Sequence, residues 1–222
     1  MAEMAKCTEM DIREGLVRFG KMLAQKGFVA GTDGNLSARL NSSRILTTPT
    51  KINKGMMRAE DLVVVDLTGR KLDGRLKPSS EILMHLTIYK MRPDVNAIVH
   101  AHPCTATAFA CSGMALDEPL CSEILVTLGE IPLAPYQTPG TPALGETLVP
   151  FIAEHDAILL ANHGVVTYGE DLLAAYMNME TVEHFAKILL AARQLGRLKP
   201  LDAKSVSELI KVRSRYKLAH VS

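Results

Sequence analysis

The chain has 222 residues, and its 25 Lys and Arg against 24 Asp and Glu give a formal net charge of +1 with the histidines neutral. Proteins that neutralise nucleic-acid phosphates carry a basic excess or a basic stripe, whereas this sequence has only scattered Lys/Arg pairs. Its 47% hydrophobic and 22% charged residues are typical of globular proteins and exclude a disordered or coiled-coil chain. We therefore expect one domain over residues 1–222, with a core large enough for a catalytic site.

Nothing in the sequence predicts a membrane segment or an export signal. No apolar run approaches the roughly 18 residues that a membrane-spanning helix needs. Residues 1–10 lack the basic start and apolar segment of a signal peptide. The cysteines form no CxxC pair and follow no framework spacing; they are Cys7, Cys104, Cys111 and Cys121. Free thiols are typical of a reducing compartment, so we expect a cytoplasmic protein without a membrane or nucleic-acid partner.

The N-terminal half is predicted to begin with a helix and to continue as short strands. Thr8 and Asp11 have the spacing of a capping box. Apolar residues then recur at helical spacing as far as Gly27, so a helix is predicted over about 11–25. The segment KPSSE at 77–81, with its proline, hydroxyl caps and acid, predicts the start of another helix that ends near residue 90. Between these helices, strands are predicted over 35–40, 44–48 and 62–67.

The C-terminal half is predicted to alternate strands with longer helices. The segment VNAIVHAH at 95–102 is strand-like, and a short helix is predicted over 105–110. Prolines punctuate an extended segment over 132–142, and a helix with a kink at Pro150 follows. The remaining predicted elements are a β-hairpin over 157–161 and 165–168, and helices over 171–194 and 203–217.

Two histidines lie two residues apart near the end of a predicted strand. On a strand, His100 and His102 point to the same face and can present two imidazoles to one ion. With seven histidines, such a pair arises by chance in about one such sequence in five, so two ordinary polar residues are the alternative interpretation. His163 lies in a tight turn after an apolar strand, where it either bonds its own backbone or points into a cleft. Three imidazoles would leave a coordination position open, as in a catalytic zinc site.

Glu81 is the candidate fourth group of this site. A carboxylate at a helix N-terminus can ligate a metal and act as a base, although helix capping is the alternative. Nearby loops supply hydroxyl and backbone N–H groups of the kind that hold a phosphate, each of which is by itself an ordinary turn or cap. The candidate phosphate-binding residues are Gly34, Asn35, Thr50, Ser79 and Ser80.

Six segments in order resemble the class II aldolase/adducin family, over roughly residues 8–200. They are DGNLSARL (33–40), TPT (48–50), KPSSE (77–81), RPDVNAIVHAHP (92–103), IPLAPY (131–136) and ANHGVV (161–166). Within the family the motifs are most similar to those of the L-fuculose-1-phosphate aldolases. The resemblance implies an α/β protein with a three-layer α/β/α fold and a mainly antiparallel central sheet. It also implies a cyclic homotetramer whose sites lie between subunits.

The resemblance also implies residue roles. His100, His102 and His163 would bind one Zn2+ per subunit, and Glu81 would be the resting fourth ligand and the catalytic acid/base. The five loop residues named above would hold the substrate phosphate. Zinc on the hydroxyl and carbonyl oxygens of dihydroxyacetone phosphate would withdraw charge and stabilise an enediolate.

The sequence departs from the family pattern in two places. Lys51 is the sixth candidate phosphate-binding residue and stands where the family often has a glycine after TPT. It either supplies charge to the phosphate or the far end of the substrate, or is a solvated surface lysine. The region 119–128 lacks the catalytic tyrosine that the fuculose-phosphate aldolases contribute from a neighbouring subunit, although Glu123 lies there. Tyr216 matches a second tyrosine of the family, one that closes over the site. The aldehyde half of the substrate is therefore less defined than its phosphate half.

The predicted function is a zinc-dependent aldolase that cleaves a ketose 1-phosphate, either L-fuculose 1-phosphate or a related deoxy sugar phosphate, into dihydroxyacetone phosphate and a short aldehyde. A ribulose-5-phosphate 4-epimerase and a sugar-acid-phosphate decarboxylase are the alternatives on the same site. A purely structural zinc site would not need a phosphate loop beside it. A non-catalytic, adducin-like interaction domain is disfavoured because the three histidines are all present.

We interpret His85, one turn after Glu81, as a packed helix residue or as a hydrogen-bond partner of that carboxylate.

Overall fold

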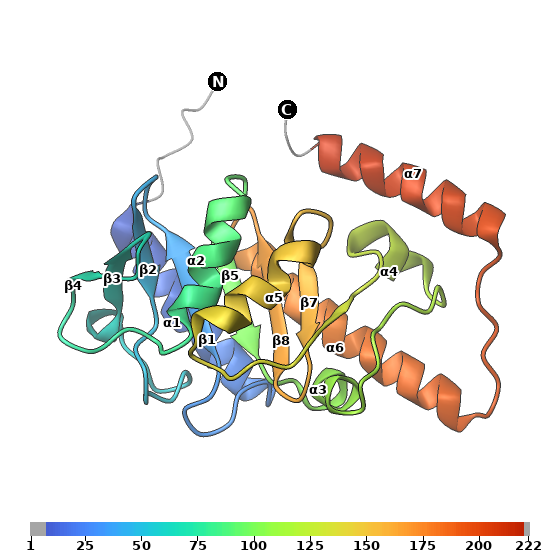
Figure 1. The fold of residues 1–222 in the computed structure, drawn as a ribbon, viewed down its shortest axis with the longest axis horizontal. Coiled ribbons are helices and arrows are strands. Elements are labelled where there is room, and N and C mark those ends of the chain that lie inside the picture. Colours follow the sequence, from blue (N-terminus) through green and yellow to red (C-terminus); the bar gives the residue numbers. More distant parts are fainter. Residues whose placement is uncertain (1–7, 220–222) are drawn as a thin grey trace.

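The computed structural model describes the backbone of residues 8–219 and the side chains of residues 8–213. Within these described residues, eight strands form one sheet in the order β4-β3-β2-β1-β5-β8-β7-β6 (Figure 1). Every neighbouring pair is antiparallel except β6 and β7, which are parallel. The predicted mainly antiparallel sheet is therefore confirmed. The strands are β1 (Asn35–Arg39), β2 (Arg44–Thr47), β3 (Val63–Asp66), β4 (Lys71–Asp73), β5 (Ala97–Ala101), β6 (Leu133–Ala134), β7 (Ala157–Leu160) and β8 (Gly164–Gly169).

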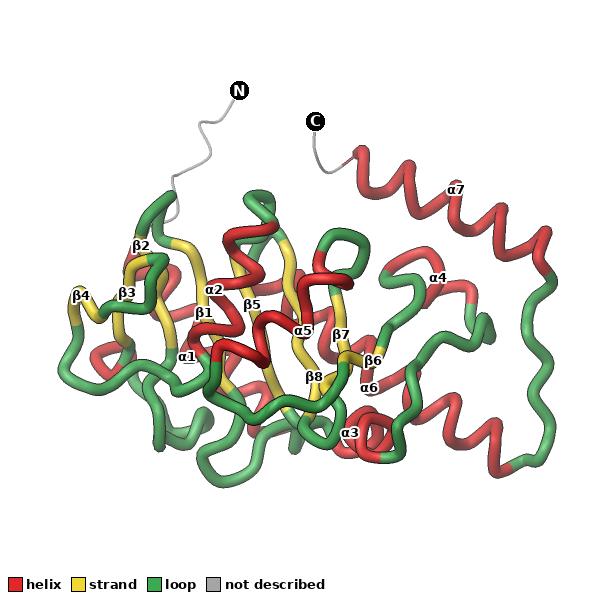
Figure 2. The backbone as a smooth tube through the Cα atoms, viewed as in Figure 1, coloured by secondary structure: helices red, strands yellow, loops and turns green. Residues whose placement is uncertain are grey.

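Helices cover both faces of the sheet, as Figure 2 shows. On one face α2 and α5 pack on each other and on the sheet, and on the other α1, α3 and α6 bury a second apolar cluster. Helix α7 packs against α4 at the β6 end of the molecule. In the part of the chain that the structure describes, no helix is both long and apolar enough to cross a membrane. The helices are α1 (Glu9–Gln25), the 3-10 helix η1 (Ala59–Asp61), α2 (Ile82–Met91), α3 (Cys104–Cys111), α4 (Ser122–Thr127), α5 (Pro142–Ile152), α6 (Leu172–Gln194) and α7 (Ala203–Ala219).

This three-layer arrangement explains the sequence of the central strand β5. Because helices bury both faces of the sheet, β5 is apolar at almost every position rather than at alternate positions. Val99 packs in the cluster with α1 and α6, whereas Ile98 packs in the cluster with α2 and α5. His100 follows on the same face as Ile98 and is fully buried, so its imidazole faces the layer that contains α2.

Several predicted elements are confirmed, and the capping box is one of them. Thr8 Oγ1 accepts a hydrogen bond from the Asp11 backbone, and the Asp11 carboxylate accepts one from the Thr8 backbone. The hairpin of β7 and β8 is also confirmed. At the predicted start of α2, the Ser79 hydroxyl accepts a hydrogen bond from the backbone N–H of Glu81 at 3.2 Å, whereas the N-cap residue Glu81 makes no side-chain capping bond. Three elements were not predicted from the sequence: α4, the two-residue β6 and the polar β4.

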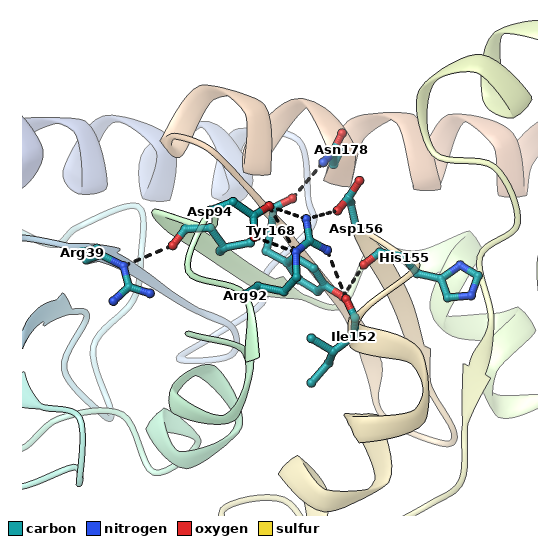
Figure 3. Close-up of polar contacts among 9 residues, drawn as sticks. Arg39, Arg92, Asp94, Ile152, His155, Asp156, Tyr168 and Asn178 are labelled. Atoms are coloured by element: carbon teal, nitrogen blue, oxygen red, sulfur yellow. Dashed lines mark hydrogen bonds and ion pairs between the residues drawn. The ribbon is translucent and has the colours of Figure 1, made fainter. Parts of the chain in front are cut away.

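A polar cluster fixes the end of the sheet at which β5 begins (Figure 3). Arg92, directly after α2, donates to Asp94 at 2.7 Å and to Asp156 at 3.1 Å. It also donates to the carbonyl oxygen of Ile152 at the end of α5. The Tyr168 hydroxyl donates to the carbonyl oxygen of His155 in the same loop. These contacts join α2, α5 and β7 at this end of the sheet. His100, His102 and His163 lie at the opposite end.

Candidate active site

Three histidines meet at the end of the sheet where β5 finishes. His100 is the fourth residue of β5, and His102 lies one residue beyond the strand. His163 lies in the turn between β7 and β8, and β8 pairs with β5 so that Val166 is opposite His100. One ligand nitrogen from each of the three imidazoles lies within 4.8 Å of the others. The sheet therefore brings together the three histidines that the sequence singled out.

Glu81 completes the cluster from the start of α2. Its Oε2 lies 3.3 Å from Nε2 of His100, and its Oε1 lies 3.2 Å from Nε2 of His163. Nε2 of His102 is in turn 3.1 Å from Nε2 of His100. The carboxylate makes no helix-capping bond, so capping does not account for its position.

These distances fit a bound metal ion. Zinc–nitrogen bonds of 2.0–2.1 Å at tetrahedral angles place two ligand atoms roughly 3.3 Å apart. The three separations of 3.1, 3.2 and 3.3 Å match that value, and they join the nitrogen and oxygen atoms that a divalent ion would bind. Three imidazoles and one carboxylate are ligands that zinc and related divalent ions accept. The residues present therefore fit a single divalent metal ion.

Hydrogen bonds orient two members of the cluster. Nδ1 of His100 lies 2.9 Å from the carbonyl oxygen of Val165. Because a carbonyl only accepts, this nitrogen carries a hydrogen, so Nε2 is the nitrogen that can bind a metal once it is unprotonated. The side-chain amide of Asn35 donates to Oε2 of Glu81 at 2.9 Å. Asn35 is opposite His100 in the β1–β5 register, so the sheet itself positions this donor.

Glycine allows the His163 turn to approach His102. A Cβ on Gly164 would lie 2.5 Å from the His102 ring and 2.7 Å from the carbonyl oxygen of Ala101. Asn162, which precedes His163, has a left-handed φ of 55°, a conformation that asparagine adopts more easily than most residues. The Asn162-His163-Gly164 sequence is therefore required by the close packing of this turn on β5.

The electrostatics of the cluster agree with a metal site. Burial alone raises the pKa of Glu81, but His100 and His163 more than offset it and hold that pKa well below its usual range. Burial and the two neighbouring imidazoles lower the pKa of His102 to about 4. For His100, burial is outweighed by Glu81, which raises its pKa. An anionic carboxylate and a neutral imidazole are the protonation states that ligands need, and a metal would replace the proton on His100.

A cavity of about 270 Å³ opens beside the cluster. All six residues predicted to bind phosphate line it; they are Gly34, Asn35, Thr50, Lys51, Ser79 and Ser80. Glu81, His102 and His163 form its inner wall, so a bound molecule can touch both groups of residues. A wider depression of about 820 Å³ lies between α1 and the start of α6 and is lined by no histidine.

Two loops form the outer part of this cavity, and they are bonded to each other. The Thr50 backbone N–H donates to Lys77, and the Ser79 N–H donates to Thr48. These N–H groups are therefore occupied, and Thr50 and Ser79 can offer only their hydroxyl groups to a ligand. Gly34 lines the cavity from a third loop with φ 68°, and a Cβ there would lie 2.5 Å from Val29.

Lys51 occupies a strained backbone position in this cavity. Its φ is 59°, in the left-handed region that favours glycine, and its side chain is exposed. This conformation explains why glycine is common at this position in the family pattern. The turn keeps its shape with lysine, and the side chain adds a positive charge at the cavity rim.

Four other residues lie apart from the cluster or contact different groups than expected. His85 does not bond Glu81; its Nδ1 lies 2.7 Å from the Ser37 hydroxyl. Cys104 is exposed at the start of α3, and Glu123 is exposed on α4. Tyr216 lies in α7, but its side chain is outside the described residues.

Two further charged residues lie in the cavity wall, and neither was among the predicted site residues. Asp33 has a carboxylate oxygen 3.6 Å from Nδ1 of His102. Lys54 is buried and also lines the cavity. Asp33 precedes the predicted Gly34-Asn35 pair and could have been found by that proximity. Lys54 lies close behind Lys51 in the segment KINKG, but nothing in that pattern predicts its burial, because lysine is usually a surface residue.

The fold is a mainly antiparallel sheet between two layers of helices. Three imidazoles and a carboxylate lie at one end of this sheet, beside a hydroxyl-lined cavity. Together these features define a metal-dependent enzyme of the class II aldolase type. The chain belongs to the family described as Class II Aldolase and Adducin N-terminal domain, which matches residues 14–190. The family resemblance expected from the six sequence segments is thereby confirmed.

Similarity to individual proteins covers most of the chain. A 3-oxo-tetronate 4-phosphate decarboxylase of Pectobacterium atrosepticum is 37% identical, and the match spans 93% of this chain and 96% of the relative. An L-fuculose phosphate aldolase of Methanococcus maripaludis is 35% identical, over 81% of this chain and 96% of the relative. The solved structure of an L-fuculose 1-phosphate aldolase superposes with a TM-score of 0.85 at 33% identity, over 93% of this chain and 96% of that one.

Proposed function

We propose that the protein decarboxylates a phosphorylated 3-oxo sugar acid of the 3-oxo-tetronate 4-phosphate type. The relative named for that reaction is 37% identical over 93% of the chain, whereas relatives named as aldolases are 35% identical over 81% of it and 32% identical over 90% of it. One observation in the sequence carries the proposal. Region 119–128 lacks the tyrosine expected of a fuculose-phosphate aldolase, and its helix α4 packs against α7.

The missing tyrosine matters because the two reactions release different groups. An aldolase must handle the proton on the hydroxyl group of a departing aldehyde, and a positioned acid/base does this. Carbon dioxide leaves without a proton. A site that has the metal ligands and the phosphate residues but lacks this tyrosine is therefore better suited to decarboxylation than to aldehyde release.

The reaction can be written with its electrons balanced. The bond between the carboxylate carbon and the neighbouring carbon breaks, carbon dioxide leaves, and the bonding pair stays on that carbon, next to the ketone. Protonation of the same carbon completes the reaction. From 3-oxo-tetronate 4-phosphate, this gives dihydroxyacetone phosphate.

The residues of the chain would divide this work. A divalent metal held by His100, His102, His163 and Glu81 would polarise the ketone oxygen and stabilise the negative charge that develops there. Glu81 is the group placed to move the proton, because its carboxylate lines the cavity and lies within 3.3 Å of His100 and His163. Asn35 would hold the Glu81 carboxylate in place. The hydroxyl groups at the cavity rim would bind the phosphate.

Aldol cleavage of a ketose 1-phosphate is the second candidate. The similarity to the L-fuculose 1-phosphate aldolase structure supports it, and so does the shared need for charge stabilisation next to a ketone. A 4-epimerase would cleave the same type of bond and then recombine the fragments. An assay for free aldehyde distinguishes aldol cleavage from epimerisation, and carbon dioxide release distinguishes both from decarboxylation.

We also propose zinc as the metal, one ion per subunit, and a homotetramer with sites between subunits. The nitrogen-rich ligand set favours zinc over magnesium or calcium. Tyr216 would then close over the site, which is the role that the family resemblance implies for it. Elemental analysis tests whether each subunit binds one zinc ion, and a measured solution mass tests whether the protein is a homotetramer.

The decisive experiment supplies the zinc-loaded protein with 3-oxo-tetronate 4-phosphate and with L-fuculose 1-phosphate in parallel. We expect carbon dioxide and dihydroxyacetone phosphate from the first and little or no product from the second. The His100→Ala variant should lose turnover together with bound metal. Rapid aldehyde formation from the ketose phosphate without carbon dioxide from the acid would reject the decarboxylase proposal.

A further inference from the structure

A lysine is buried in the wall of the candidate active site. Lys54 is 1% exposed, and lysine is almost never buried to this degree unless its charge is paired. Its ammonium group donates to the backbone carbonyl oxygens of Thr32 at 2.9 Å and Ile52 at 2.6 Å. An ammonium has three N–H donors, so these two bonds leave one donor for another acceptor.

The charge of this ammonium group is not neutralised by the protein. Among the side chains that the structure describes, no carboxylate forms an ion pair with Lys54, and both its hydrogen-bond partners are uncharged. Burial lowers the pKa of Lys54 to about 8, although Asp33 and Glu81 act in the opposite direction. Burying an unpaired charge is unfavourable, so this arrangement is stabilised when an anion binds beside it.

The position of Lys54 identifies which end of the substrate it faces. It lines the same cavity as the six predicted phosphate-binding residues. Its two carbonyl partners belong to the two loops that carry Gly34 and Thr50. Those loops provide donors that suit a phosphate but, apart from the exposed Lys51, no other positive charge.

We propose that Lys54 binds the substrate phosphate directly and thereby selects phosphorylated substrates over unphosphorylated ones. The third N–H of its ammonium group donates to a phosphate oxygen, while the other two hold together the loops that contain Thr32 and Ile52. This inference deepens the proposed function and rests on it only for the identity of the rest of the substrate. It holds equally for a decarboxylase or an aldolase.

A purely structural role for Lys54 is the competing explanation, because its carbonyl contacts alone could hold the two loops. Three variants of Lys54 separate the explanations. Lys54→Met removes both the donors and the charge. Lys54→Gln keeps two N–H donors for the carbonyl groups but removes the charge, and Lys54→Arg keeps the charge. Lys21→Met is the control, because it removes the same charge from an exposed position on α1.

The test measures binding of glycerol 3-phosphate, a phosphate ester that does not react, to the zinc-loaded protein by calorimetry, with glycerol as the blank. We expect Lys54→Met and Lys54→Gln to bind it at least 10-fold more weakly than the wild type, with unchanged zinc content. Lys54→Arg should bind within a few-fold of the wild type, and Lys21→Met within twofold. If Lys54→Met does not fold, Lys54→Gln decides the question alone.

If folded Lys54→Gln binds glycerol 3-phosphate as tightly as the wild type, the inference is wrong. The N–H donors that hold the loops would then be sufficient, and the charge would not contribute to phosphate binding. Its failure can be told apart from failure of the proposed function. If the wild type decarboxylates the sugar acid but Lys54→Gln binds the ester normally, only the inference falls. If Lys54→Gln loses the ester but the wild type releases no carbon dioxide, only the decarboxylase proposal falls.

Discussion

The side-chain amide of Asn35 donates a 2.9 Å hydrogen bond to Oε2 of Glu81, the same oxygen that lies 3.3 Å from His100. Asn35 is buried on β1, directly opposite His100 on β5. The sheet therefore positions both His100, a candidate metal ligand, and Asn35, the hydrogen-bond donor that orients Glu81. Although Asn35 was predicted from the sequence to bind phosphate, this contact places it next to the reacting groups.

Replacing Asn35 with alanine should therefore reduce kcat more than it raises KM. A hydrogen bond to a charged group contributes about 1.5–3 kcal/mol, which corresponds to a loss of about 10- to 100-fold. Steady-state kinetics at saturating metal measure both constants, and Asn41→Ala, in an exposed turn, is the control. A rise in KM with kcat unchanged would show that Asn35 serves the phosphate instead.

Glu183 provides a second long-range support for the site. This buried residue of α6 accepts hydrogen bonds from the backbone N–H groups of Thr105 and Ala106, at 2.9–3.2 Å. These N–H groups belong to the first turn of α3, which starts two residues after His102. A carboxylate at a helix N-terminus is stabilising because it meets unpaired donors and the positive end of the helix dipole. The contact thus anchors the segment that carries His102.

Glu183→Ala should lower the free energy of unfolding by about 2–3 kcal/mol, because it leaves buried N–H groups unpaired. Chemical denaturation measures this, and Glu146→Gln, which alters an exposed carboxylate of α5, should change stability by less than about 0.5 kcal/mol. Zinc affinity should fall in the same Glu183 variant, since His102 loses its anchor. Equal stability of the two variants would mean that α3 does not depend on this cap.

These contacts illustrate what the sequence can and cannot predict. The histidines and Glu81 were found because metal ligands follow local patterns, a pair two residues apart and a residue at a turn or helix start. The layered sheet followed from the family resemblance. Glu183 carries no local signal, since its partners in α3 are far away along the chain. Likewise, the polar strand β4 pairs only at the sheet edge, where neither burial nor alternation marks it.

Lys51 offers a test of backbone strain at the cavity rim. A non-glycine residue in the left-handed region costs roughly 1–2 kcal/mol, and Lys51 has φ 59°. Lys51→Gly should therefore be about 1 kcal/mol more stable than Lys51→Ala, even after the entropy that glycine gains in the unfolded chain. Both variants lose the charge, so this comparison isolates the backbone effect. Equal unfolding free energies of the two variants would show that the turn relaxes without strain.

The pH dependence of phosphate-ester binding tests the charge on Lys54. Burial lowers the pKa of this lysine to about 8 in the free protein, and the charged groups that act on it are Asp33 and Glu81, which raise it. The protonated form binds the anion, so affinity should be full below pH 8 and fall as the pH rises above 8. A phosphate ester stays doubly charged over that range, because its second pKa is about 6. Calorimetry between pH 7 and pH 9.5 should show this decline in the wild type and a flat, weak affinity in Lys54→Gln. The same decline in both proteins would assign the titration to another group.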